Sequence, residues 1–430
     1  MARGLWQVRR RWVGQRIGPR PTVPDSSRLG ALEQWYAVQP IPRVCGVALE
    51  WSTSQPWPEL RAALQQVVAR HAERLARTLT WGGDDGHYRF APLQGPMEDC
   101  LQVYPAGADL FSVAEHALHT AFSPGTPLFR ACATSDGRGL VLVFHHVIAD
   151  GQGAVNVARD LARALAGANL RPAQAPPALE AVADMRPSVR QVAQQLRAAA
   201  RPQGFFAGPA HMDASLQTRI FPLVLAAPLA HQLRARARIH GASVHAALCM
   251  AALRATRVIG AGSQPLLLSS PISLRARIAH DLTDMGVYID NYESVHVRPT
   301  PDRFWAVAAE YRGQLRQAVQ HAPAAISLLN WVRDLRGLAN ERTRERPNGR
   351  TATVEVSNLG VQPWEADTDA LWFLQGNHYH GPLLNLSVVT AADLGAIRIC
   401  LSVPDPLVTP AQVCAYLAEL LHTIQWAARS

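Results

Sequence analysis

The sequence predicts an α/β (α+β) protein of two similar subdomains, each a mixed sheet flanked by helices. Three observations support this prediction. The chain has 430 residues, of which 48% are hydrophobic and 17% charged, so it is too apolar for disorder and long enough for two or three domains. Helical and strand-like patterns alternate through both halves. Residues 167–187 are rich in proline and alanine, the composition of a linker between the halves.

In the first half, apolar residues at helical spacing and short apolar runs bounded by turns define the elements. The runs GGDDG (82–86) and SDGRG (135–139) predict turns. The run LVLVF after the second turn is typical of a strand buried on both faces. We expect helices over 60–76, 112–122 and 154–166, and strands over 87–93, 128–134 and 140–145.

The second half repeats this alternation, and its last two strands form a hairpin about the turn AADLG. We expect helices over 189–200, 228–240, 244–258, 303–320, 325–338 and 411–426, and strands over 221–225, 265–269, 287–297, 351–358, 383–390 and 396–403. The expected organisation is a basic arm (1–20), an N-terminal subdomain (21–170), a linker region (171–209) and a C-terminal subdomain (210–430).

The net charge of +9 comes from arginine alone, because all 42 basic residues are arginines. This bias is typical of a GC-rich coding sequence, although the charge favours anionic partners such as cofactor phosphates, an acidic carrier protein or a membrane surface. We expect no nucleic-acid partner, since no binding motif appears and the arginines are spread along the chain.

The six cysteines are scattered without a CxxC pair, which argues against a zinc framework and against a secreted disulfide scaffold. We interpret them as reduced thiols of a cytoplasmic protein. No stretch reaches the roughly 18 apolar residues of a transmembrane helix. The arm at 1–20 contains six arginines and two tryptophans. A surface-docked arm and a helix in contact with a membrane surface are both open interpretations of it.

The segment FHHVIADGQG (144–153) carries the most chemical information. His145 and His146 follow the apolar strand, and Asp150 lies four residues after the second histidine. Gly151 and Gly153 permit a tight turn and leave space above the site. A neutral histidine titrates near pH 6.5, so it can accept a proton from a hydroxyl or an amine near neutrality. The segment therefore predicts a base on a rigid strand end with an open approach.

The same residues also have structural interpretations. Both histidines can be core residues, although the doubled histidine beside D-G-x-G disfavours this. Metal ligation with Asp150 is disfavoured because adjacent strand residues point in divergent directions and no third histidine has a useful spacing. Asp150 can also cap a helix that begins near Gly151, a role compatible with catalysis.

The segment HHVIADG resembles HHxxxDG, the signature of a superfamily that includes chloramphenicol acetyltransferase, nonribosomal-peptide condensation domains and plant BAHD acyltransferases. Within it, the chain is most similar to stand-alone condensation-like enzymes, which include alcohol acetyltransferases, polyketide-associated acyltransferases and wax ester synthases. The plant-type DFGWG motif is absent. Four further stretches resemble the group, and the similarity covers most of 25–425: LRAALQQVVARHAERLART (60–78), SSPISLRARI (269–278), VSNLG (356–360) and the ending at 383–421.

The resemblance implies roles for the residues that match its motifs. His146 would be the general base, and it would deprotonate the acceptor for attack on a thioester carbonyl without an acyl-enzyme. His145 would be structural, with its side chain on the opposite side of the strand. Asp150 would orient the loop through an ion pair, with Arg275 as the expected partner.

A tetrahedral intermediate also needs hydrogen-bond donors for its oxyanion. The Gly151 N–H is one candidate, and Gly151 completes the expected catalytic set with His146 and Asp150. Ser357 and Asn358 are candidate contacts to the oxyanion or to the acceptor. Alternatively, Ser357 and Asn358 only shape a turn with Gly360.

The resemblance implies two chloramphenicol-acetyltransferase-like subdomains that form a V with a solvent channel between them. The implied activity is transfer of an acyl group from a thioester, preferably acyl-CoA, to an alcohol or amine. Coenzyme A or a phosphopantetheine thioester would be a co-substrate, with no permanently bound cofactor and no metal, and an acyl or peptidyl carrier protein is a further candidate partner. The alternatives are a stand-alone condensation domain with carrier-bound substrates and a non-catalytic binding protein on the same fold.

Three further features have open interpretations. The basic loop at 341–350 is either a solvated surface or a contact for phosphates of coenzyme A or phosphopantetheine. His378 and His380 are either loop residues or metal ligands. Trp364 and Trp372 are either packing residues or part of an acyl tunnel.

Overall fold

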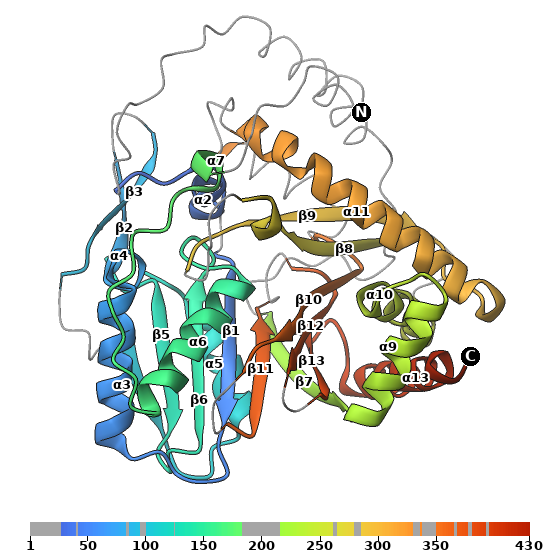
Figure 1. The fold of residues 1–430 in the computed structure, drawn as a ribbon, viewed down its shortest axis with the longest axis horizontal. Coiled ribbons are helices and arrows are strands. Elements are labelled where there is room, and N and C mark those ends of the chain that lie inside the picture. The colour runs from blue at the N-terminus through green and yellow to red at the C-terminus, as the bar shows by residue number, and fades with distance from the viewer. Residues whose placement is uncertain are drawn as a thin grey trace, which may run out of the picture.

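The computed structural model describes residues 27–430 except 40–41, 83–85, 95–99, 124, 183–215, 261–264, 279–284, 330–335, 338–349, 365–367, 377–380 and 393–394. The described strands form two large sheets and a small hairpin sheet of β2 (Arg77–Trp81) and β3 (Tyr88–Pro92). Helices cover the large sheets, as Figure 1 shows. The mixed α/β class predicted from the sequence is confirmed.

The first large sheet has the strand order β11-β1-β6-β5-β4. Strand β4 is parallel to β5, and the other neighbours are antiparallel. Strand β6 is buried along its whole length, as its continuous apolar run predicts. The strands are β1 (Val44–Glu50), β4 (Leu101–Tyr104), β5 (Phe129–Thr134), β6 (Gly139–His145) and β11 (Ala370–Gln375).

Strand β11 comes from the C-terminal half of the chain but pairs with β1 in the first sheet. Leu374 lies opposite Gly46, and Leu371 lies opposite Leu49. Figure 1 shows this orange strand beside the blue β1. The division into subdomains at 21–170 and 210–430 stays a prediction. Strand β11 belongs to the second of these segments but pairs within the sheet of the first.

The second large sheet has the strand order β7-β13-β12-β10-β8-β9. Strand β10 runs parallel to both β8 and β12, and the remaining neighbours are antiparallel. The expected hairpin at the end of the chain is β12–β13. The strands are β7 (Gln217–Leu225), β8 (Leu266–Ser273), β9 (Ile289–His296), β10 (Val354–Gln362), β12 (Leu384–Ala391) and β13 (Ile397–Asp405).

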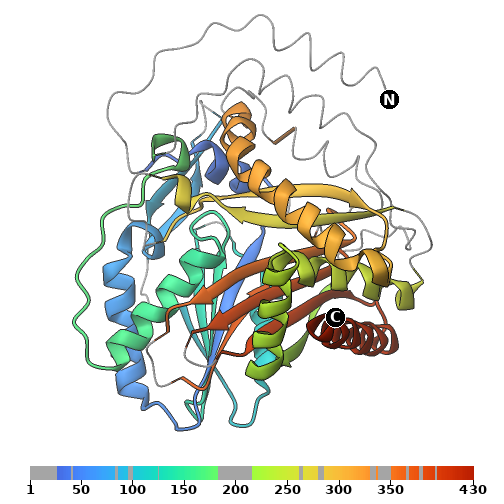
Figure 2. The same ribbon diagram turned by 45° about the vertical axis from the view of Figure 1, so that its right-hand side comes forward.

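The described helices cover both faces of the first sheet, whereas on the second sheet they lie mainly on one face. Helices α3 and α6 pack on one face of the first sheet, and α5 packs on the other. Four helices pack against the apolar face of the second sheet, and Figure 2 shows α13 and the green helices on the same side of its strands. The longer helices are α3 (Trp57–Arg70), α5 (Leu110–His119), α6 (Gly151–Leu165), α9 (Ala227–Ile239), α10 (Val244–Ala255), α11 (Phe304–Leu329) and α13 (Pro410–Arg429).

The short helical elements connect these layers. They are α2 (Ala31–Ala37), α4 (Ala72–Leu75), α7 (Leu179–Val182) and the 3-10 turns η3 (Thr256–Ile259), η4 (Arg275–Arg277) and η5 (Pro301–Arg303). None of the described helices is by itself apolar and long enough to span a membrane. The bent pair Ala227–Ile239 and Val244–Ile259 reaches that length and hydropathy only when taken together.

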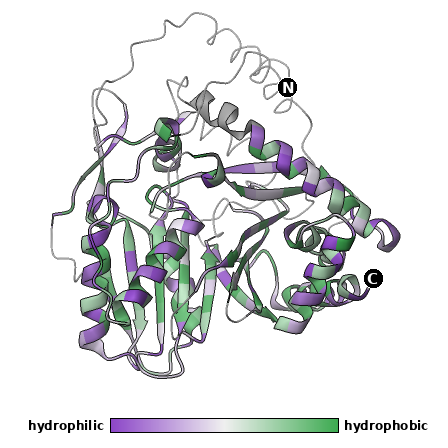
Figure 3. Ribbon diagram, in the orientation of Figure 1, coloured by the Kyte–Doolittle hydropathy of each residue, from purple (hydrophilic) through white to green (hydrophobic). Residues whose placement is uncertain are grey.

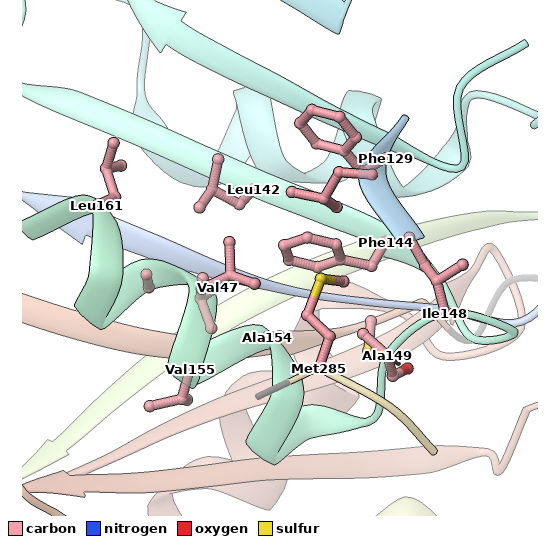
Figure 4. Packing of buried hydrophobic residues seen from close by; sticks show 14 of the residues in the cluster. Val47, Phe129, Leu142, Phe144, Ile148, Ala149, Ala154, Val155, Leu161 and Met285 are labelled. Atoms are coloured by element: carbon pink, nitrogen blue, oxygen red, sulfur yellow. Dashed lines mark hydrogen bonds between the residues drawn. The ribbon is translucent and has the colours of Figure 1, made fainter. Parts of the chain in front are cut away.

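The core beneath helix α6 anchors the end of strand β6. Phe144 and Leu142 on β6 pack with Val47 on β1 and with Leu161 on α6, and all four are buried (Figure 4). Figure 3 shows hydrophobic residues along the strands of the first sheet, whereas α6 is hydrophobic on only part of its surface. The end of β6 is therefore held rigidly.

Several elements differ from the sequence predictions. Helix α11 (Phe304–Leu329) joins the helix expected over 303–320 to the first residues of the one expected over 325–338 and continues through Pro323. Residues 330–335 and 338 of the second expected helix lie outside the described residues. The sequence patterns did not predict α2, β1, β4 or β11. The helix expected over 189–200 and the arm at 1–20 lie outside the described residues.

Substitution of Gly46 by alanine tests the close approach of β1 and β6. A Cβ atom at this position would lie 2.5 Å from the backbone oxygen of Leu142, so Gly46→Ala should lower the free energy of unfolding by about 1–3 kcal/mol. Thermal and urea unfolding would measure the change. In the control Gly313→Ala, on helix α11, a Cβ would have no neighbour within 4 Å, and we expect no loss of stability. Equal stability of Gly46→Ala and wild type would contradict the packing.

Candidate active site

The end of strand β6 sends its two histidines to different surroundings. The Nδ1 atom of His145 accepts a hydrogen bond from the Val147 N–H at 3.1 Å, and its ring packs edge-on against Phe122 at 5.7 Å. Burial lowers the pKa of His145 to about 3, so this ring is neutral at pH 7. His145 is not among the residues that line the central cavity, whereas His146 is.

His146 is fixed from two sides. Its backbone N–H donates to the Arg43 carbonyl at 2.8 Å, and its ring stacks on Tyr36 of helix α2 with centroids 4.3 Å apart and planes parallel. Burial lowers the pKa of His146 to about 4, although the charge of Asp150 acts in the opposite direction. His146 is therefore an oriented, neutral imidazole at pH 7.

Asp150 is fully buried and organises the turn after the histidines. Its Oδ1 atom accepts from the Gly153 N–H at 2.8 Å, which caps helix α6. Its Oδ2 atom accepts from the Tyr288 N–H at 2.9 Å and from Nη1 of Arg275 at 2.5 Å. The backbone N–H of Asp150 donates to the Gly286 carbonyl at 3.1 Å. Asp150 thus joins the motif to Arg275, Gly286 and Tyr288.

The Asp150 side chain holds its neighbours in place and does not itself reach the cavity. It does not line the cavity, but its neighbour Gly151 and its partner Arg275 do. The Arg275 guanidinium also lies over the Tyr288 ring at 5.0 Å. The structure thus places Asp150 and Arg275 together in a buried ion pair.

The cavity lies between the two large sheets and has a volume of about 110 Å³. Both halves of the chain contribute to it, and strand β11 brings Phe373 to its wall. A Cβ atom on Gly151 would lie 2.7 Å from the Phe373 ring, so a larger residue here would have to displace that ring. The lining residues used below are Tyr36, Arg43, His146, Gly151, Gln152, Arg275, Glu355, Ser357, Asn358, Phe373, Gln375 and Asn385.

The structure brings Ser357 and Asn358 to the same cavity as His146. The Oδ1 atom of Asn358 accepts from the Gly360 N–H at 2.8 Å, and Gly360 has a φ of 71°, so Asn358 shapes a turn. Ser357 is buried on strand β10. The hydrogen bond of the turn uses the side-chain oxygen of Asn358, Oδ1. The side-chain NH₂ group of Asn358 can still donate a hydrogen bond.

Gln152 connects the motif to strand β10. Its Nε2 atom donates to Asn156 Oδ1 at 3.1 Å and to Gln362 Oε1 at 2.8 Å. Because Asn156 is on α6 and Gln362 is on β10, the first turn of α6 is tied to the strand that carries Ser357.

Among the cavity-lining residues to which sequence reasoning gave no role are Tyr36, Arg43, Gln152, Glu355, Phe373 and Asn385. A signal existed for two of them. Glu355 stands between valines in TATVEVSN, and Asn385 stands between leucines in LLNLS. A polar residue alternating with apolar residues in a strand indicates a second face that is not simple core. Gln152 lies within the motif segment 144–153 itself, whereas Tyr36, Arg43 and Phe373 reach the cavity through long-range packing, which leaves no local pattern.

The remaining sequence hypotheses have the following outcomes. Trp364 belongs to the buried core, and the Trp372 ring packs edge-on against Phe111 at 5.1 Å. Neither lines this cavity, so both pack in the core as described, and the acyl-tunnel interpretation stays a prediction. His378, His380 and the loop at 341–349 lie outside the described residues. In the part of the chain that is described, no group of three or more histidine, cysteine or acidic residues could hold a metal ion.

The fold is shared with solved structures of an acetyltransferase and of a nonribosomal-peptide-synthetase cyclization-docking bidomain. The chain superposes on the TRI3 trichothecene 15-O-acetyltransferase of Fusarium sporotrichioides with a TM-score of 0.70, 14% identity and coverage of 96% of this chain and 100% of that one. It superposes equally well, with a TM-score of 0.70, on the EpoB cyclization-docking bidomain of Sorangium cellulosum (15% identity, 99% and 89% coverage). At these identities the likeness concerns the fold.

Sequence comparison reaches a smaller part of the chain. Over 130 residues, 29% of this chain, it is 36% identical to a probable non-canonical nonribosomal peptide synthetase, CymA, of Salinispora arenicola (strain CNS-205). The matched region is only 2% of that relative's length. No family model matches the chain.

Arg275 tests the buried ion pair. Arg275→Ala would leave the Asp150 carboxylate buried without its cation, and we expect a loss of about 3–5 kcal/mol in the free energy of unfolding. The control is Arg303→Ala, which removes an exposed pair with Glu310 at 3.9 Å and should cost less than about 1 kcal/mol. Thermal unfolding of both variants beside wild type would measure the difference. Equal midpoints for wild type and Arg275→Ala would refute a stabilising pair.

Proposed function

We propose that this protein is an acyltransferase that moves an acyl group from a thioester to an alcohol or amine acceptor, with His146 as the general base. One observation carries the proposal: a neutral, stacked imidazole faces a cavity between two sheets, on a fold that the structure shares with an acetyltransferase. A base must be unprotonated to act, and burial keeps His146 in that form at pH 7.

The proposed reaction needs no covalent enzyme intermediate. His146 accepts the proton of the acceptor while the acceptor oxygen or nitrogen forms a bond to the thioester carbonyl carbon, and the carbonyl electron pair moves to oxygen. On collapse, the C–S bond breaks, and the leaving sulfur takes the proton back from the imidazolium. The products are the ester or amide and a free thiol, with neutral His146 restored.

The surroundings of His146 supply what this reaction needs. The charge of Asp150 favours the imidazolium that forms during the reaction, while Tyr36 holds the ring in place. The Gly151 N–H, Ser357 and the Asn358 amide are our candidates for stabilising the oxyanion. We prefer acyl-CoA as the donor. A donor on a carrier protein is the alternative, which the likeness to part of a probable peptide synthetase supports.

Thiol release from acyl-CoAs of increasing length, with pooled alcohols and amines, tests the proposed activity. We expect thiol release that depends on the acceptor, and the acyl length that is released fastest would report the size of the donor site. Replacing His146 by alanine should reduce the rate by about 10²–10⁴-fold. The matched control is His422→Ala on the exposed surface of α13, which should retain activity.

Each result has a defined meaning. Release that persists in the His146→Ala variant would disprove the role of His146 as base. If no acyl-CoA donates, the same assay with acyl groups on a carrier protein decides between the two donors. Failure of both donor types with folded protein would overturn the acyltransferase proposal.

The pH dependence of kcat/KM tests the protonation state of the base. The neutral form of His146 is active, and it is lost as the pH falls through its pKa of about 4. The acid limb of kcat/KM, which reports the free enzyme, should therefore lie near pH 4 rather than near pH 6.5. Enzyme returned to neutral pH after each exposure would control for acid unfolding. A limb near pH 6.5 in enzyme that remains folded would contradict the proposal.

A further inference from the structure

Three neutral hydrogen-bonding side chains of the cavity wall have no hydrogen-bond partner among the described residues. They are Tyr36 on helix α2, Ser357 on β10 and Asn385 on β12, and all three line the same cavity as His146. Their exposed fractions are 7%, 4% and 2%. A buried polar group without a hydrogen bond costs free energy, and nearly all such groups in folded proteins are paired. A ligand in the cavity would supply the missing partners.

The Tyr36 hydroxyl is a donor beside the base. Its ring stacks on His146 with parallel planes, a geometry in which the two rings do not hydrogen-bond to each other. Burial raises the pKa of Tyr36, so the hydroxyl stays protonated at pH 7. The charges that act on this hydroxyl include those of Arg43 and Glu355, which both line the cavity. The hydroxyl can therefore donate to a group bound next to His146.

Ser357 and Asn385 belong to the wall formed by the second sheet. Val356 and Leu386 are paired neighbours on β10 and β12 and belong to the core under the helices. Ser357 follows Val356 and Asn385 precedes Leu386, so both lie on the other face, because successive side chains alternate between the faces of a sheet. The Oδ1 atom of Asn385 is buried without a partner in the described part of the chain. Both side chains can donate as well as accept.

The charged residues of the cavity do not select a charged ligand. Arg43, Arg275 and Glu355 all line it, so both signs of charge face the same space. Arg275 is paired with Asp150, and Glu355 accepts a hydrogen bond from Ser269 at 3.1 Å. The class of ligand is therefore decided by the neutral groups that have no partner.

Hydroxyl groups are the neutral groups that match this set. A hydroxyl both donates and accepts, as Ser357 and Asn385 do, and it can accept from Tyr36. A carboxylate only accepts and an ammonium group only donates, so each would leave part of the set unpaired. Because Tyr36 and Asn385 come from different elements and a further group must face His146, a ligand with a single hydroxyl does not suffice.

We infer that the acceptor is a neutral polyol, of which one hydroxyl faces His146 while others bind Tyr36 and Asn385. This inference rests on the proposed acyltransferase function. The hydroxyl oxygen at His146 attacks the thioester carbon, and His146 takes its proton. The C–S bond then breaks, and the leaving sulfur takes the proton back. The products are a monoester of the polyol and a free thiol.

Equilibrium binding of two matched probes tests the inference without a thioester. Glycerol and pentan-3-ol share a central hydroxyl and have equal numbers of non-hydrogen atoms, but methyl groups replace the two terminal hydroxyls of glycerol. Ligand-observed NMR titration gives their Kd values. We expect wild-type protein to bind glycerol at least about tenfold more tightly, because pentan-3-ol leaves the buried groups unpaired.

Two variants identify the groups that bind the additional hydroxyls. Asn385→Leu removes the amide, and Tyr36→Phe removes the hydroxyl but keeps the ring that stacks on His146. Each should weaken glycerol binding about three- to tenfold without weakening pentan-3-ol binding. The matched control is Tyr104→Phe, because the Tyr104 hydroxyl bonds to Gln102 at 3.5 Å and Tyr104 does not line the cavity. It should retain the preference for glycerol, and circular dichroism would verify folding.

The outcomes separate this inference from the proposed function. Equal binding of the two probes to wild type, or tighter binding of pentan-3-ol, overturns the inference without any variant, even if simple alcohols are acylated. A preference for glycerol that survives in both Asn385→Leu and Tyr36→Phe also overturns it. A preference that either variant lowers, in a protein that releases no thiol from any donor, supports the polyol site and overturns the proposed function alone.

Discussion

The structure around the cavity depends on the buried carboxylate of Asp150. This side chain satisfies a helix N-terminus, a backbone N–H at Tyr288 and the Arg275 guanidinium at the same time. Removing a carboxylate from water is costly, and only several good partners together make up for that cost. Because these partners come from both halves of the chain, the buried carboxylate ties the motif loop to Arg275 and Tyr288. The position of His146 follows from this constraint.

Burial has opposite consequences for the two charged states of His146. It disfavours the imidazolium, which keeps the ring neutral and able to accept a proton. Asp150 favours the imidazolium, so its charge offsets part of the effect of burial on the pKa of His146. The parallel Tyr36 ring fixes the orientation of the imidazole. The His146 ring is thus neutral at pH 7, while the nearby negative charge of Asp150 favours its protonated form.

How much of this the sequence could predict depends on distance along the chain. The segment 144–153 contains a strand end, two histidines, a capping aspartate and two glycines in one contiguous run, so local rules predict most of its geometry. Tyr36 and Phe373 reach the cavity through packing and through the pairing of β11 with β1. No local pattern encodes such contacts, and predicting the fold class does not supply the register that creates them.

The strand patterns around Glu355 and Asn385 indicated these two residues as further candidates for the site. Each is a polar residue at an alternating position of a strand whose other face is core. Alternation identifies the face, but only the β10–β12 register shows that the two residues are neighbours. The exchange of β11 into the first sheet brings Phe373 to the cavity beside Gly151. His146 and these two residues therefore come from separate sheets, and their common cavity is a property of the packing between the sheets.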